Sequence, residues 1–124
     1  MHDLTFGNCL RMFRQAHEPS LTQEQLAIAI ERSKMTVCQF EQEKNAPPQG
    51  ELLDKVINAL ELSEEDGAML RFLAAKQRKA LPTDVESYFF ENPAIYDVIR
   101  IAKQNKISNE YWEKLVIQLG EKNE

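Results

Sequence analysis

Apolar residues recur at helical spacing along almost the whole chain, and the alternation typical of strands is nearly absent. The clearest case is the set Leu52, Leu53, Val56, Ile57 and Leu60, which forms the broad apolar stripe of a buried helix. We therefore predict an all-α protein of about eight short helices. They are expected over residues 3–17, 22–30, 33–41, 52–60, 63–79 and 81–90, from 93 onward, and from 108 to about 120.

Helix start signals agree with this pattern. Thr22 followed by Gln25 forms a capping box, in which the threonine side chain caps the helix and the glutamine reaches back. Asn92 followed by Pro93 predicts an N-cap with proline at the first helical position. Serine is expected to cap two further helices, at Ser33 and Ser108, and the segment that starts at Ser63 is expected to open another.

Charge limits the kinds of partner that the whole chain can attract. The 124 residues include 15 basic and 20 acidic ones, for a net charge of −5. Residues 1–62 hold six basic and nine acidic residues, so neither half of the chain is basic. A nucleic-acid-binding surface would therefore have to be a local patch.

Residue types that carry out chemistry are sparse. His2 and His17 share no metal-ligand spacing, and no Ser/His/Asp set or Gly-rich phosphate loop is visible. We expect no enzyme activity, no cofactor and no metal. Cys9 and Cys38 are too few for a disulfide framework, and Cys9 is expected in the core. With no secretory signal and no membrane-length apolar stretch, a cytoplasmic protein is the default expectation.

Two short helices at residues 22–30 and 33–41, joined by a tight turn, have the arrangement of a helix-turn-helix. In that motif the first helix braces on the DNA backbone. The second helix places its N-terminal side chains against base edges in the major groove.

The residues around this pair resemble the lambda-repressor-like helix-turn-helix of the XRE/Cro type. The resemblance is carried by Leu21-Thr22-Gln23-Glu24-Gln25-Leu26-Ala27, by Ser33, Val37, Phe40-Glu41 and Pro47, by residues 53–60, and by residues 6–14. It covers about residues 3–62, half of the chain. It implies a five-helix domain in which residues 1–62 bind DNA and a fifth helix over 63–79 packs on them.

The resemblance also implies roles for individual residues. Lysine can donate to guanine, glutamine can pair with adenine, and methionine can pack on a thymine methyl group. The base-contacting positions are Lys34, Met35, Cys38 and Gln39. The phosphate-contacting positions are Gln23, Thr36 and Lys44. Arg14 and Glu41 match a structural ion pair that ties the first helix to the third.

Two positions depart from the family pattern. Glu31 stands in the turn between the two helices and Glu43 follows the second helix, where the family often has glycine. Both bring negative charge near the expected phosphates. A basic stretch over residues 71–79, without acidic residues, either complements the end of its helix or reaches flanking phosphates.

Residues 80–124 resemble an extension seen in many bacterial and phage XRE-type regulators, which are often encoded beside a metalloprotease or a toxin-like partner. We expect a packed three-helix extension that serves dimerisation or the binding of a protein partner. Its aromatic residues are expected mainly in the core: Phe89, Phe90, Tyr111 and Trp112.

The resemblance implies a sequence-specific transcriptional regulator that binds double-stranded DNA. Its expected form is a homodimer on a pseudo-palindromic operator, repressing its own operon or a phage or other mobile element. The alternative is an antitoxin-like or adaptor protein whose main ligand is another protein. The net negative charge and the two glutamates favour that alternative, whereas Lys34 and Gln39 favour DNA.

Overall fold

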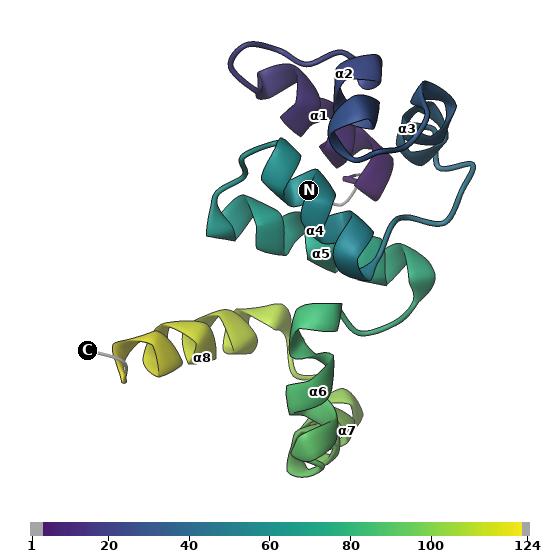
Figure 1. Cartoon of the computed structure of the whole chain (residues 1–124). Helices are drawn as coiled ribbons and strands as arrows, with labels where there is room; N and C mark the ends of the chain where they lie inside the picture. The colour runs from purple at the N-terminus through teal and green to yellow at the C-terminus, as the bar shows by residue number, and fades with distance from the viewer. Residues whose placement is uncertain (1–3, 123–124) are drawn as a thin grey trace. The chain divides into compact units, whose positions relative to one another are not determined.

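The computed structural model describes residues 4–122, so His2 and Asp3 lie outside the described part. Within that range the chain has eight α-helices and no strand (Figure 1), which confirms the all-α prediction. The helices are α1 (Phe6–Ala16), α2 (Gln23–Ala29), α3 (Lys34–Glu41), α4 (Gly50–Ala59), α5 (Glu64–Arg78), α6 (Thr83–Glu91), α7 (Ala94–Gln104) and α8 (Asn109–Glu121).

The chain divides into two compact units, Met1–Glu86 and Ser87–Glu124. The boundary falls inside α6, further along the chain than residue 80, where the extension was expected to begin. Unit 1 therefore contains α1 to α5 and the start of α6. Unit 2 contains the end of α6 together with α7 and α8.

Unit 1 is built around one apolar core. In it α3 packs against α1 and α2, α5 packs against α1 and α4, and α4 packs against α2 (Figure 1). Cys9 is only 1% exposed, as its place on the apolar side of α1 predicts. The other buried members of the core are Phe6, Leu10, Leu26, Ala27, Ile30, Val37, Phe40, Leu53, Val56, Leu60, Leu70, Leu73 and Ala74.

Helix starts in unit 1 follow local side-chain chemistry. Both hydrogen bonds of the capping box at Thr22 and Gln25 are present, and the hydroxyls of Ser33 and Ser63 accept from backbone N–H groups three residues on. The expected start of the first helix near residue 3 is wrong. Helix α1 begins at Phe6 because the hydroxyl of Thr5 accepts from the backbone N–H of Asn8 and caps it.

Two expected caps in the extension take a different form. Asn92 does not cap α7 with its side chain, since its amide donates backward to the carbonyl of Tyr88 at 2.8 Å. The N-cap position of α7 is Pro93. Ser108 does occupy the N-cap position of α8, but its side chain makes no capping hydrogen bond.

Five helices end in a left-handed residue that carries a side chain. At each end the N–H of the left-handed residue bonds to the carbonyl three residues earlier, and the N–H of the following residue bonds to the carbonyl five residues before it, the pattern that glycine usually serves. Glu31 and Glu43 both adopt this conformation, with φ values of 59° and 60°. The chain therefore makes the left-handed turns despite the missing glycines. The five residues are Glu31, Glu43, Glu61, Lys79 and Lys106.

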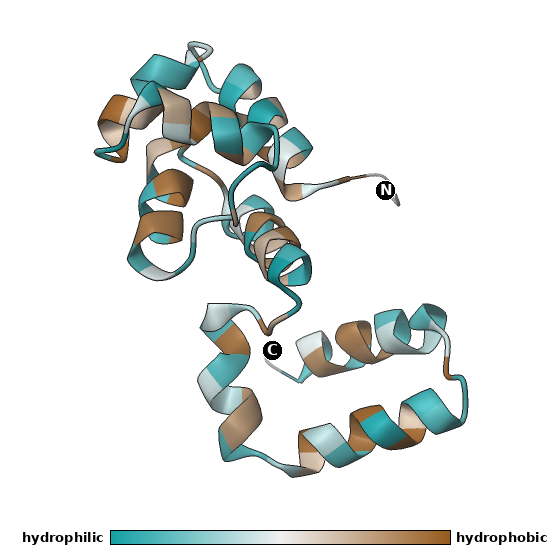
Figure 2. Ribbon diagram, turned by 90° about the vertical axis from the view of Figure 1, so that its right-hand side faces the viewer, coloured by the Kyte–Doolittle hydropathy of each residue, from teal (hydrophilic) through white to brown (hydrophobic). Residues whose placement is uncertain are grey.

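Unit 2 contains no buried residue among its described positions, 87–122. The expectation of a packed aromatic core is therefore wrong for Phe90 and Tyr111, which are 68% and 55% exposed. Phe89 and Trp112 are half-buried. Apolar segments recur along all three helices of this part of the chain (Figure 2).

Candidate nucleic-acid interface

Helices α2 and α3 are held together by their apolar sides. The turn between them is short, running from Ile30, which ends α2, to Ser33, which caps α3. Leu26 and Ile30 of the first helix and Val37 and Phe40 of the second all belong to the buried core. This packing fixes which side of α3 faces outward.

A buried ion pair attaches the end of α1 to the end of α3. The Nε of Arg14 donates to Oε2 of Glu41 at 2.7 Å, and its Nη2 donates to Oε1 at 3.0 Å. The remaining nitrogen, Nη1, donates to the carbonyl of Leu21 at 2.8 Å. One arginine therefore links three segments: α1, the loop before α2, and α3.

Gln23 joins the same network. Its Nε2 donates to Oε1 of Glu41 at 3.0 Å, and the side chain is half-buried. Arg11 Nε lies 3.6 Å from that oxygen. The residue expected to contact a phosphate thus also braces α2 against α3. Sequence reasoning missed this second contact because it joins residues far apart in the chain.

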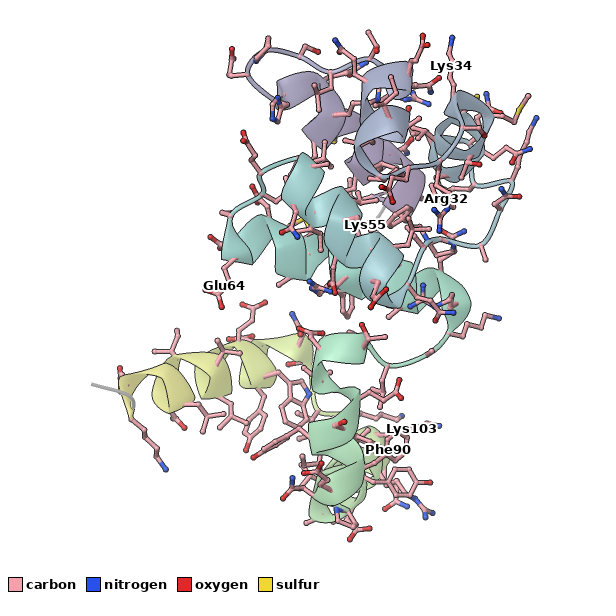
Figure 3. All side chains as sticks on the ribbon, in the orientation of Figure 1. Arg32, Lys34, Lys55, Glu64, Phe90 and Lys103 are labelled. Carbon is pink, nitrogen blue, oxygen red and sulfur yellow. The ribbon has the colours of Figure 1, made fainter. Side chains whose placement is uncertain are left out.

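The outer side of α3 presents a cation, a thioether and an amide. Lys34 and Met35 are exposed, Met35 by 64%, and Lys34 points away from the rest of unit 1 (Figure 3). Cys38 and Gln39 are half-buried beside them. The Oε1 of Gln39 accepts from Nδ2 of Asn45 at 2.7 Å. Asn45 was not expected in the site, and its place just after Lys44 in a turn-rich loop is the only signal for it in the sequence.

The other two expected phosphate contacts differ in exposure. Thr36 is half-buried, and its hydroxyl lies 3.0 Å from that of Ser33. Lys44 is exposed in the loop after α3. Arg32, also exposed, adds a positive charge that sequence reasoning missed at the turn before α3.

The negative charge of Glu31 is balanced within the protein. Lys55 Nζ donates to Oε2 of Glu31 at 3.0 Å. This hydrogen bond, followed by the positive charges of Lys55 and Arg32, holds the pKa of the Glu31 carboxyl below its ordinary value. Glu43 is exposed, and no ion pair with it is seen in the described part of the chain.

Two of the four cations in the basic stretch of residues 71–79 make structural contacts. Arg71 Nη2 lies 2.8 Å from Oδ1 of Asp54, and Arg78 Nη1 donates to the carbonyls of Pro47 and Pro48 at 3.3 and 3.1 Å. Arg78 therefore fixes the loop between α3 and α4. Of the four cations in this stretch, Lys76 and Lys79 are the exposed ones.

Residues 4–122 contain no cluster of three or more histidine, cysteine or acidic side chains that could hold a metal ion. None of the described helices has the length and apolar character needed to cross a membrane.

Comparison of the chain with family models, with curated proteins and with solved structures gave no match in any of the three.

Proposed function

We propose that this protein is a sequence-specific DNA-binding transcriptional regulator with a lambda-repressor-like helix-turn-helix in unit 1. In this proposal it acts in the cytoplasm as a homodimer on a pseudo-palindromic operator, and represses its own operon or a phage or other mobile element. One observation carries the proposal. Helix α3 is fixed from behind by the buried Arg14–Glu41 pair, while Lys34, Met35 and Gln39 remain on its outer side.

A fixed helix suits base reading because little freedom is lost when it docks. Lys34 and Met35 lie in the first turn of α3, the part of a recognition helix that contacts base edges. The contact with Asn45 holds the amide of Gln39 by its oxygen. That oxygen has a second lone pair and the amide has two N–H groups, so bidentate pairing with adenine stays available.

An exposed cation lies on each side of α3 along the chain. Arg32 precedes α3 and Lys44 follows it, and both are exposed. Glu31, in the turn before α3, is paired with Lys55. Its carboxylate therefore repels nearby phosphates less. These charges support a local patch for phosphates on a chain that is acidic overall.

The second candidate is a protein-binding module of the antitoxin or adaptor type. It is favoured by the net charge of −5 and by the exposed Glu43 next to Lys44. The two candidates differ in how binding responds to salt and to DNA sequence.

Fluorescence anisotropy separates them. Labelled DNA from just upstream of the protein's own gene is compared with scrambled DNA over a series of salt concentrations. A regulator should prefer its operator by ~10³-fold or more, with affinity falling as salt rises. Weak and equal binding to both DNAs would reject the DNA-binding proposal in favour of a protein partner.

Point variants then test the assigned face. Gln39→Ala should weaken operator binding by about 1–3 kcal/mol and relax the preference at one base pair. Lys34→Ala should also weaken operator binding, because it removes the cation in the first turn of α3. If Gln39→Ala and Lys34→Ala both bind like the wild type, α3 is not the reading helix.

A further inference from the structure

Taken by itself, unit 2 leaves a large apolar surface uncovered by its own helices. The helix pairs that pack closely all belong to α1–α5, and α6, α7 and α8 make few contacts with one another. Eleven large apolar side chains between residues 87 and 122 are at least 40% exposed. They are Tyr88, Phe90, Tyr96, Val98, Ile99, Ile101, Ile107, Tyr111, Val116, Ile117 and Leu119.

The size of this surface matches a stable protein interface. Each of these side chains exposes on the order of 100 Å², since each is 40–69% exposed and an aromatic side chain offers roughly 150–250 Å² in all. The eight of them that lie on α7 and α8 therefore expose about 800 Å², comparable with what each partner contributes to a standard interface. A monomeric protein seldom leaves so much apolar surface in contact with water.

The apolar stripe of α8 continues past the point where the chain covers it. Trp112, Leu115, Val116 and Leu119 follow one another at helical spacing on one side. Trp112 and Leu115 are half-buried, but Val116 is 69% and Leu119 is 52% exposed. The other helices of unit 2 therefore leave the second half of the stripe uncovered.

Charge favours a second copy of this chain as the occupant. Residues 87–122 carry five acidic and five basic residues, whereas residues 1–86 carry fourteen acidic and ten basic ones. Two copies repel less through unit 2 than through unit 1. The charges in unit 2 are also segregated, because residues 100–106 hold three cations and residues 110–113 hold two anions. In a two-fold pair each of these segments can face its opposite in the other copy.

We propose that two copies of the chain associate through the exposed apolar residues of α7 and α8, and that this contact holds the homodimer together. The proposal rests on the proposed function in one respect, since it names the surface of the dimer assumed there. A unit of fewer than about 40 residues seldom folds without such support. Dimerisation supplies the core that unit 2 lacks on its own.

Sedimentation equilibrium of the full chain, without DNA, tests the proposal. The wild type should have twice the 14.3 kDa chain mass at micromolar concentration. Val116→Glu should raise the dimer dissociation constant by about 30-fold or more, the loss expected of a residue central to an interface. Ile28→Glu is the matched control, because Ile28 is 70% exposed but lies on α2, and it should leave the constant unchanged.

Three results would overturn the proposal: a monomeric wild type, an Ile28→Glu variant that dissociates while Val116→Glu does not, or a Val116→Glu variant as dimeric as the wild type. Circular dichroism of Val116→Glu keeps the test valid, since the substitution is at an exposed site and unit 1 should melt as before. A dimer without operator preference would support this proposal and reject the DNA-binding one. A monomer that binds its operator specifically would reject this proposal and support the DNA-binding one.

Discussion

Arg14 and Glu41 form a buried two-point contact across 27 positions of the chain, with Nε to Oε2 at 2.7 Å and Nη2 to Oε1 at 3.0 Å. Arg14 is 9% and Glu41 2% exposed. The carboxylate also accepts from Gln23, so its charge is matched by donors from α1 and α2. The orientation of α3 depends on this contact as well as on apolar packing.

Glu41→Ala should lower the free energy of unfolding by about 3–5 kcal/mol, because it leaves the Arg14 guanidinium buried without its partner. Lys55→Ala is the matched comparison, since it breaks the exposed pair with Glu31 and should cost less than about 1 kcal/mol. Urea unfolding followed by circular dichroism measures both. Equal losses of unfolding free energy in the two variants would show that the buried pair stabilises the fold no more than the exposed pair does.

Gly7→Ala should destabilise unit 1 by about 1–3 kcal/mol. A β-carbon at Gly7 would meet the backbone carbonyl of Glu41 and force α1 away from α3. Gly120→Ala serves as control because a β-carbon there meets nothing, and it should leave stability unchanged or raise it by less than about 1 kcal/mol. Thermal unfolding of both variants measures these effects. A Gly7→Ala variant with the melting temperature of the wild type would contradict the close approach of α1 and α3.

Glu43→Gly should raise the free energy of unfolding by about 1 kcal/mol, since glycine adopts the left-handed conformation without strain from a β-carbon. Glu43→Ala keeps the β-carbon and removes the charge, so it should bring no such gain. Chemical denaturation of the two variants separates strain from charge. If both stabilise equally, repulsion by the carboxylate explains the effect.

The two cysteines should differ sharply in reactivity. Burial, followed by the nearby charge of Asp66, raises the pKa of Cys9 to about 11. Near pH 8 only about one thiol in a thousand is then ionised, and its 1% exposure blocks reagents. Ellman's reagent should therefore modify one thiol per native chain, Cys38, and both after denaturation. Native Cys38→Ser should not react, and rapid labelling of it would contradict the burial of Cys9.

Much of unit 1 could be predicted because its signals are local. Thr22, Ser33 and Ser63 cap helices with hydroxyls that bond to N–H groups three residues away, and the sequence alone displays that spacing. Gln23 and Asn45 could not be predicted in their observed roles. Their partners, Glu41 and Gln39, are chosen by the way helices and loops come together in space.

Unit 2 shows a different limit. Helical spacing of apolar residues predicts that a surface will be covered, but not whether the cover comes from the same chain. Trp112 and Tyr111 are adjacent on α8, yet the first is half-buried and the second 55% exposed. The aromatic pattern predicted the helix correctly, but a core position wrongly for Tyr111.

The left-handed helix ends show what a side chain can add at a corner of the fold. Glu31 reaches Lys55 of α4 from one such corner, and Glu61 reaches His17 from another, at 3.0 and 3.1 Å. Glycine would relax the backbone at both places but would remove these links between separate segments. The backbone at these corners follows the path that glycine usually takes, while the side chains there hold separate segments of unit 1 together.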